Sequence, residues 1–258
     1  MTKPRPAFWL AFVATLLVPL AGFAQKKPKI IVVTHGQASD PFWLVVRNGV
    51  ETAAKETGSD VEYQATGQFD LPAMSKLVDA AVASKPDGLV VSIPDAVFLS
   101  KSIQAAVAAK IPVISINSGL DVSKKLGCLM HIGQEEESAG REAGRRLKAL
   151  GVKQAVILNQ EIGNVALDQR TKGFRDGFEV KLCTFDISPR VIQALTQKQM
   201  GFALDQQQWL QGYLPVIFLA NYAKYGSILQ NDLILTGPSF VTPENVEQVA
   251  NLTNKGSR

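Results

Sequence analysis

Short apolar runs alternate with amphipathic stretches along most of this chain. Continuous apolar runs such as IIVV at 30–33 are typical of strands buried on both faces of a sheet, whereas apolar residues at helical spacing are typical of helices that cover a sheet. In the first half we expect strand, helix, strand, helix, strand, helix and strand, at residues 29–35, 42–58, 61–66, 71–86, 87–94, 96–111 and 111–119. This order predicts a parallel sheet flanked by helices.

The alternation starts again after the apolar run CLMHIG at 128–133. The expected elements are helices at 135–150, 164–178, 189–197 and 214–225, and strands at 153–159, 180–186 and 201–206. We therefore predict an α/β chain of two lobes, each a parallel sheet flanked by helices. The N-terminal lobe is expected to contain residues 25–131 and 207–226, and the C-terminal lobe residues 132–206 and 227–258.

The first 24 residues resemble a secretory signal peptide in composition. Lys3 and Arg5 precede the apolar run AFWLAFVATLLVPL, and AGFA supplies small residues at the expected cleavage positions before Gln25. An uncleaved membrane anchor is the alternative, because the apolar run approaches the length of a membrane span, but Pro19 and the small residues favour cleavage. We expect the chain to be exported and cleaved after Ala24.

Charge and residue content point away from several classes of function. Removal of residues 1–24 takes away Lys3 and Arg5 and no acidic residue, so the formal net charge falls from +4 to +2. Such a chain gives no indication of binding to nucleic acid or to an anionic membrane. Cys128 and Cys183 lie in apolar runs and are expected to be buried free thiols, with a disulfide as the alternative. We find no metal-ligand set, nucleophile elbow or dinucleotide turn, so neither a cofactor nor an enzymatic activity is expected.

Polar side chains gather where the expected strands end. They occupy residues 34–40 and 92–95, Asn117, Asn159, Asp186 and residues 205–208, which lie in the segment LDQQQWLQGYLP at 204–215. Because parallel sheets place their functional loops at the carboxyl ends of strands, these residues are candidates for one site. A solvated loop is the alternative for the glutamine-rich segment.

Five segments carry a resemblance to a known family, namely SDPFWLVVRNGVETAAKETG, KPDGLVVSIPDA, IPVISINSG, HIGQEEESAGREAG and LDQQQWLQGYLP. In this order they resemble the type I periplasmic sugar-binding proteins, the ribose-binding-like receptors that deliver solutes to ABC transporters. The resemblance runs from about residue 29 to residue 253 with one gap. It implies a monomer in the periplasm that binds a sugar or sugar-like polyol between its lobes and passes it to a membrane permease. LacI-type repressors share the fold, but they carry an N-terminal DNA-binding headpiece.

The resemblance also implies ligand contacts. A sugar site needs fixed side chains that donate and accept hydrogen bonds, and flat rings that cover the C–H faces of the sugar. The family's motif places Asp40 in a polar position and Phe42 and Trp43 as a stacking pair, with packing at the start of the helix as the alternative. The other candidate contacts are Asn117, Gln134, Asp168, Arg170, Asp186 and Gln206.

Some of these positions keep alternatives. Asn117 stands where pentose-binding members usually have Asp followed by Arg, so ribose itself is not favoured. Asp168 aligns with a sugar-contacting Arg of the family, and Arg170 lies two positions later, so the two cannot share a helix face. Asp168 is our first choice. Gln134 is a hinge or a ligand residue, and Trp209 either caps the cleft or packs at the hinge.

The departure from the family lies in the second lobe, where only three residues separate Phe178 from Leu182. The family normally has two further strand–helix units here, roughly 50–60 residues. We predict that an internal deletion removed them, together with an aromatic and an Asn-type contact, and a compact natural variant is the alternative. Two other functions compete with the sugar receptor. One is a binding-defective truncated paralogue, which the gap favours, and the other is an exported hydrolase on a similar α/β fold.

Overall fold

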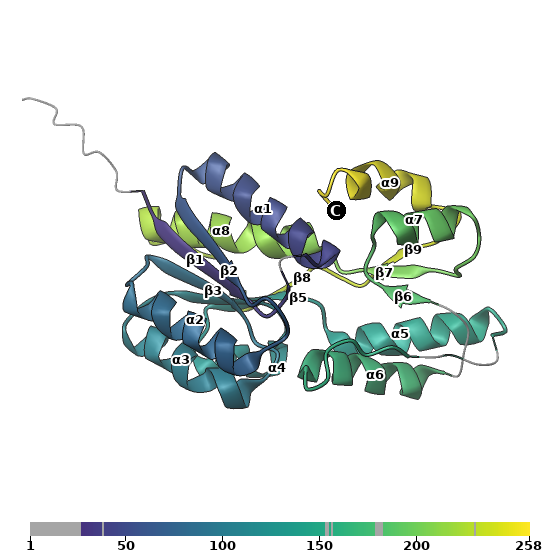
Figure 1. The fold of residues 1–258 in the computed structure, drawn as a ribbon, viewed down its shortest axis with the longest axis horizontal. Coiled ribbons are helices and arrows are strands. Elements are labelled where there is room, and N and C mark those ends of the chain that lie inside the picture. Colours follow the sequence, from purple (N-terminus) through teal and green to yellow (C-terminus); the bar gives the residue numbers. More distant parts are fainter. Residues whose placement is uncertain (1–26, 38, 153–154, 156, 179–182, 230) are drawn as a thin grey trace, which may run out of the picture.

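The computed structural model describes residues 27–37, 39–152, 155, 157–178, 183–229 and 231–258. These residues form two lobes side by side, each with a sheet between layers of helices (Figure 1). The predicted α/β fold class is therefore confirmed. The predicted signal peptide, residues 1–24, lies outside the described residues.

The first lobe is built on a six-stranded sheet in which all neighbouring strands are parallel. Its order is β2-β1-β3-β4-β5-β8, and the strands are β1 Lys29–Thr34, β2 Asp60–Ala65, β3 Gly88–Ser92, β4 Val113–Asn117, β5 Met130–Gly133 and β8 Leu233–Leu235. Helices α2 (Leu71–Ala83) and α3 (Ala96–Ala108) cover one face, and α1 (Pro41–Thr57) and α8 (Gln208–Tyr225) cover the other (Figure 1). The short α4 (Leu120–Ser123) and the 3-10 helix Lys124–Leu126 lead from β4 to β5.

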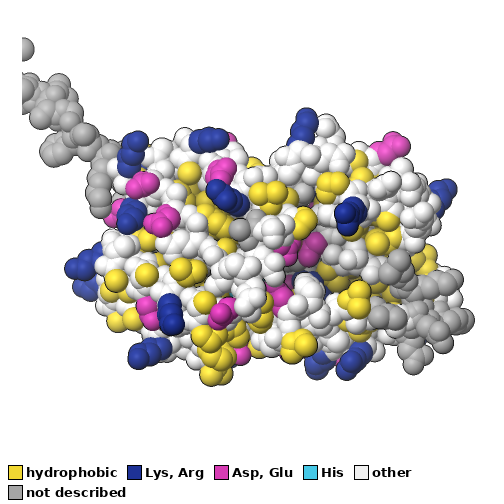
Figure 2. Space-filling view, in the orientation of Figure 1, with side chains coloured by type: hydrophobic (Ala, Val, Ile, Leu, Met, Phe, Trp, Pro, Cys, Tyr) yellow, Lys and Arg dark blue, Asp and Glu magenta, His cyan; other side chains and the backbone are white. Residues whose placement is uncertain are grey.

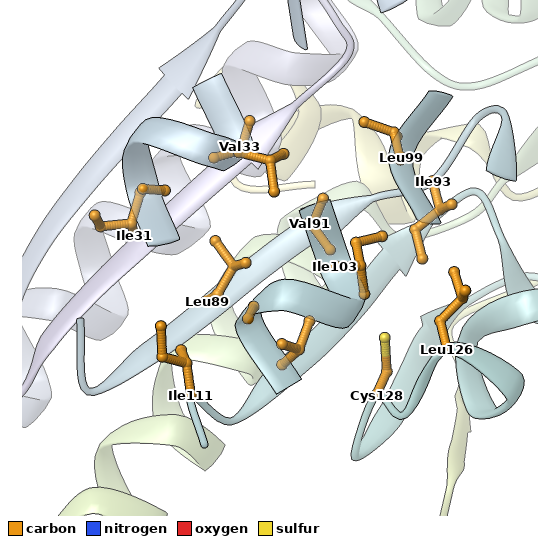
Figure 3. Close-up of a cluster of buried hydrophobic side chains, with 14 of the residues drawn as sticks. Ile31, Val33, Leu89, Val91, Ile93, Leu99, Ile103, Ile111, Leu126 and Cys128 are labelled. Atoms are coloured by element: carbon orange, nitrogen blue, oxygen red, sulfur yellow. The ribbon is translucent and has the colours of Figure 1, made fainter. Parts of the chain in front are cut away.

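Both faces of the sheet are buried at the inner strands β1, β3, β4 and β5, which is why these strands read as mainly apolar runs. Ile31 and Val33 of β1 pack with Leu89 and other side chains under α2 and α3 (Figure 3). Ile30 and Val32, which alternate with them along the strand, pack under α1 and α8. All four β1 side chains are at most 1% exposed. A strand buried in this way has no polar face to show in the sequence.

Helices α1 and α8 approach each other closely at two glycines. A Cβ added to Gly49 would lie 2.2 Å from the Trp209 carbonyl oxygen, and one added to Gly212 would lie 1.9 Å from the Val46 carbonyl oxygen. Any larger residue would push the helices apart. This contact holds α8 on the first lobe.

The second lobe has a smaller sheet of order β6-β7-β9, with β6 Thr184–Phe185, β7 Ala203–Asp205 and β9 Ser239–Val241. Helices α5 (Glu136–Ala149) and α6 (Val165–Gly177) pack on one face, and α7 (Pro189–Thr196) and α9 (Val246–Asn254) on the other (Figure 1). β6 and β7 are parallel, but β9 runs antiparallel to β7. The expectation that both sheets are wholly parallel therefore holds only for the first.

The expected strand at 153–159 is a second difference. Residues 155 and 157–159 form no strand, and of the described part of 180–186 only Thr184–Phe185 is a strand. An apolar run becomes a strand only where a neighbouring strand accepts its backbone hydrogen bonds. Residues 155 and 157–159 pair neither with the edge strand β6 nor with any other described strand.

Within the described residues the chain passes between the lobes in three short segments. They join β5 to α5, β7 to α8 and β8 to β9. Because β8 pairs with β5, residues 233–235 complete the first sheet, whereas we expected all of 227–258 in the second lobe. The run LIL is too short for its periodicity to reveal which sheet it joins.

The structure also tests the expectation about the two cysteines. Cys128 is buried and Cys183 is partly buried, and both are free, which confirms the prediction of free thiols. Among the described helices, none combines the length and the apolar character that crossing a bilayer requires.

Candidate ligand site

A cavity of about 200 Å³ lies between the two lobes, at the carboxyl ends of strands from both sheets. Figure 2 shows Asp and Glu side chains in the hollow between the lobes. Seven of the nine residues chosen from the sequence line this cavity: Asp40, Phe42, Trp43, Asn117, Arg170, Asp186 and Gln206. Their contact with a ligand stays a prediction.

The start of α1 forms one wall of the cavity. Asp40 is the N-cap of this helix, and its carboxylate accepts a hydrogen bond of 2.8 Å from the Phe42 backbone N–H. Burial raises the pKa of Asp40, although the same hydrogen bond opposes the rise. Trp43 is 4% exposed and meets the His35 ring edge-on at 4.8 Å. Trp43 therefore lines the cavity and also packs in the core of the first lobe.

A chain of hydrogen bonds joins the lobes across the floor of the cavity. The Asn117 amide of the first lobe donates to Gln206 Oε1 at 3.3 Å, and Gln206 Nε2 donates to the Asp186 carboxylate of the second lobe at 2.7 Å. Asn117 and Asp186 have φ of 61° and 68°, a region that residues with a Cβ adopt uncommonly. Such strained positions cluster at functional sites because the surrounding structure must hold them there.

A buried ion pair lies in the wall that the second lobe contributes to the cavity. The Arg170 guanidinium donates to both carboxylate oxygens of Glu136, at 2.7 and 3.0 Å, and lies 3.9 Å from the centre of the Phe185 ring. Burial disfavours the charged guanidinium, but Glu136 outweighs this effect and raises the pKa of Arg170 above its usual value. The arrangement gives one rigid, permanently charged group at the cavity.

Our preference for Asp168 over Arg170 is reversed by the geometry. Asp168 lies on the exposed face of α6, where it accepts a hydrogen bond of 3.3 Å from Asn159, and it does not line the interlobe cavity. Arg170 lies two residues later, on the other face of the helix, and lines the cavity. Gln134 also does not line the cavity. It is wholly buried at the first crossover and donates to Glu136 at 3.0 Å.

Sequence reasoning missed several side chains that line the cavity. His35 Nε2 lies 3.4 Å from the Glu161 carboxylate, and Asn164 donates to that carboxylate at 2.7 Å. Burial acts to raise the pKa of Glu161, but the contacts with His35, Asn164 and Arg170 outweigh it and lower the pKa. His35 lies in the polar stretch after the first strand, so its position at a strand end indicated a candidate. Asn164 is the N-cap of α6, and its capping pattern could likewise be recognised in the sequence. Ser118, Glu136 and Gln160 also line the cavity.

The glutamine-rich segment 204–215 is a buried part of the hinge and not a solvated loop. Gln207 Nε2 donates to the Thr236 carbonyl at 2.9 Å, and Gln211 Nε2 donates to the Thr236 hydroxyl at 3.1 Å. Gln208 and Gln211 have no exposed surface. Trp209 stacks on Tyr213 at 4.5 Å and does not line the cavity. The segment therefore ties the second crossover to the third.

We expect Asp186→Asn to stabilise the protein at alkaline pH. Burial raises the pKa of Asp186 to about 7 from 3.8, so the unfolded chain loses this proton at a lower pH than the folded chain. Stability of the native chain then falls as the pH rises from about 4 to 7, and the full cost is present above 7. Asn keeps the acceptor for Gln206 and carries no charge.

Urea unfolding at pH 4, 6 and 8 measures this effect. Asp186→Asn should gain stability over the native chain progressively across the series, while the exposed control Asp168→Asn should follow the native chain. A constant difference between Asp186→Asn and the native chain at all three pH values would show that the carboxyl does not titrate in this range.

Comparison with known proteins agrees with this geometry. A family model described as a periplasmic binding protein domain matches residues 30–183. The xylose/arabinose-binding protein of Sulfolobus acidocaldarius is 22% identical, over 85% of this chain and 72% of the relative. The D-ribose/D-allose-binding protein of Pseudomonas aeruginosa is 26% identical, over 60% of this chain and 50% of the relative.

A solved structure of a carbohydrate transporter is also similar to this chain. The carbohydrate transporter of Acidothermus cellulolyticus, in complex with myo-inositol, aligns with a TM-score of 0.84 at 29% identity, covering 90% of this chain and 100% of that chain. The alignment with the Sulfolobus relative spans 292 positions, more than the 258 residues of this chain, so part of the relative has no counterpart here. The family match over more than half of the chain agrees with the two-lobed fold and its interlobe cavity, and this chain belongs to the periplasmic binding protein family.

Proposed function

We propose that this protein is a periplasmic receptor that binds a sugar or sugar-like polyol between its lobes and delivers it to the permease of an ABC transporter. The observation that supports this most is the interlobe cavity, to which both lobes contribute hydrogen-bonding side chains and the first lobe an aromatic wall. The named ligands of the relatives, xylose, arabinose, ribose and allose, and the myo-inositol of the solved complex, are all small polyols.

The chemistry of the cavity suits such a ligand. Hydroxyl groups donate to the carboxylates of Asp40 and Asp186, and the amides of Asn117 and Gln206 can exchange their mutual bond for bonds to the ligand. The Trp43 ring offers an apolar surface for the C–H groups of a sugar. Because these groups come from both lobes, a ligand that contacts all of them stabilises the closed arrangement.

Location, partner and oligomeric state follow from this proposal. Export through the N-terminal segment would place a monomeric receptor in the periplasm, where the permease is its partner. The family and the matched relatives are binding proteins, which favours binding over an exported hydrolase.

We expect Asp40→Asn to weaken sugar binding by roughly 10-fold to 100-fold, because a charged acceptor is replaced by a neutral one. Asn also caps helices well, so α1 should stay intact. Calorimetric titration with xylose, ribose, allose and myo-inositol measures the change. Asp95→Asn is the matched control, since Asp95 caps α3 in the same way and does not line the cavity.

Equal affinities for Asp40→Asn and Asp95→Asn would remove Asp40 from the site. Absence of binding by the native chain to all four compounds would favour the second candidate function, a binding-defective truncated paralogue. The short second sheet is the observation that supports this candidate.

A further inference from the structure

A second cavity of about 280 Å³ opens in the second lobe beside the interlobe cavity. The two cavities share five lining residues: Gln160, Leu167, Arg170, Phe185 and Asp186. The two cavities therefore adjoin each other along the wall that these five residues form. A molecule seated against Asp186 in the first cavity therefore lies next to the second.

The second cavity differs from the first in chemistry. Beyond the shared residues, its walls are mostly apolar: Ile157, Leu158, Phe174, Cys183 and Met200, with Asn159, Thr171 and Thr184 as the polar exceptions. The first cavity also has apolar walls, among them Phe42, Trp43 and Ile187, but four carboxylates, one guanidinium and several amides line it as well. The pair of cavities thus offers a polar compartment next to an apolar one.

The junction between the compartments is rigid. The Phe185 ring lies 3.9 Å from the Arg170 guanidinium, and Glu136 holds that guanidinium with two hydrogen bonds. Leu167 is buried beside them. The Phe185 ring and the Leu167 side chain are apolar and lie beside the charged Arg170–Glu136 pair. This junction suits a ligand that has a polar part in the first cavity and an apolar part in the second.

Two apolar side chains of the second cavity are exposed to solvent. Leu158 is 86% exposed and Ile157 is 38% exposed. Exposed apolar surface in a concave site gains free energy when an apolar group covers it. Since this surface continues from the polar cavity, the ligand itself is the group best placed to cover it.

We infer that the natural ligand is a sugar or polyol with an apolar substituent, such as an alkyl or aryl glycoside, whose polar ring occupies the interlobe cavity and whose substituent occupies the second cavity. This rests on the proposed function of the interlobe cavity. It adds the chemical class of the ligand, since a plain sugar leaves the apolar compartment empty.

A homologous series of glycosides tests the inference. Methyl, propyl, butyl and phenyl xylopyranosides and glucopyranosides, both anomers of each, are titrated with the full chain by calorimetry beside the free sugars and myo-inositol. Each methylene buried in the second cavity should tighten binding about four-fold, so butyl should bind roughly 60-fold more tightly than methyl.

A variant separates the second cavity from non-specific adsorption. Thr171 lines the second cavity and not the first, so Thr171→Trp should fill it and abolish the gain along the series while leaving methyl glycosides unchanged. Arg175→Trp, on the exposed face of the same helix and outside both cavities, is the matched control and should keep the gain.

The outcomes distinguish the inference from the proposed function. If free sugars or methyl glycosides bind but chain length has no effect, or if Thr171→Trp keeps the gain, the apolar substituent is refuted and the sugar receptor stands. If no member of the panel binds, the proposed function and the inference both fail.

Discussion

Arg170→Met is expected to lower the free energy of unfolding by about 3–5 kcal/mol. Met has a similar length and no charge, so the substitution removes the cation and leaves the Glu136 carboxylate, which is 4% exposed, without its partner. A buried carboxylate without a cation carries a desolvation cost, which the remaining hydrogen bond from Gln134 offsets only in part. Urea denaturation at pH 7, followed by far-UV circular dichroism, measures the loss.

Lys172→Met on the same helix is the matched control. Lys172 pairs with Glu137 at 2.6 Å, but its side chain is 62% exposed, and such pairs contribute at most about 1 kcal/mol. The double variant Arg170→Met/Glu136→Leu should recover much of the loss, because it removes both buried charges. Equal losses for Arg170→Met and Lys172→Met would show that the Arg170–Glu136 pair is solvated in solution.

Plain sugars are expected to bind this chain weakly, and restoring the second lobe should tighten their binding by roughly 30-fold to more than 10,000-fold. The range follows from two lost contacts at about 1–3 kcal/mol each. Restoration means inserting, between Phe178 and Cys183, two strand–helix units of roughly 50–60 residues. Titration of Trp43 fluorescence with xylose, ribose, allose and myo-inositol measures both affinities, because Trp43 lines the cavity.

A chain with a Gly/Ser linker of equal length at the same place is the control for the insertion itself. It should bind no better than the chain as it stands, because it supplies neither strands nor contacts. Tight, saturable binding of plain sugars by the 258-residue chain would show that the short second lobe is complete and that the deletion is not a defect.

The first lobe was predictable from sequence because its strands are buried on both faces and its helices on one. The runs that gave β1, β3 and β4 are long and apolar enough to allow one interpretation, and Asp40, Asp70 and Asp95 mark the starts of their helices. The second lobe was less predictable, because β6, β7 and β9 have two or three residues each and their pairing depends on neighbours far along the chain. Neither the antiparallel direction of β9 nor the sheet that β8 joins is encoded in local pattern.

The residues that line the cavity were also predictable only in part from the sequence. Asn117, Asp186 and Gln206 were found because they follow strands, and the topology brings strand ends together. Arg170 was ranked below Asp168 because the resemblance fixes an alignment but not a helix face. His35 and Asn164 carried strand-end and capping signals, but their contacts with each other and with Glu161 join the two lobes, and no local segment reveals such contacts.

The position of Gln206 would couple occupancy of the cavity to the angle between the lobes. This one amide bonds Asn117 on one side and Asp186 on the other, and its backbone belongs to the segment that joins β7 to α8. A ligand that takes over either bond would break the link between this segment and one of the lobes. A permease that senses the angle between the lobes would in this way distinguish a loaded receptor from an empty one without touching the ligand.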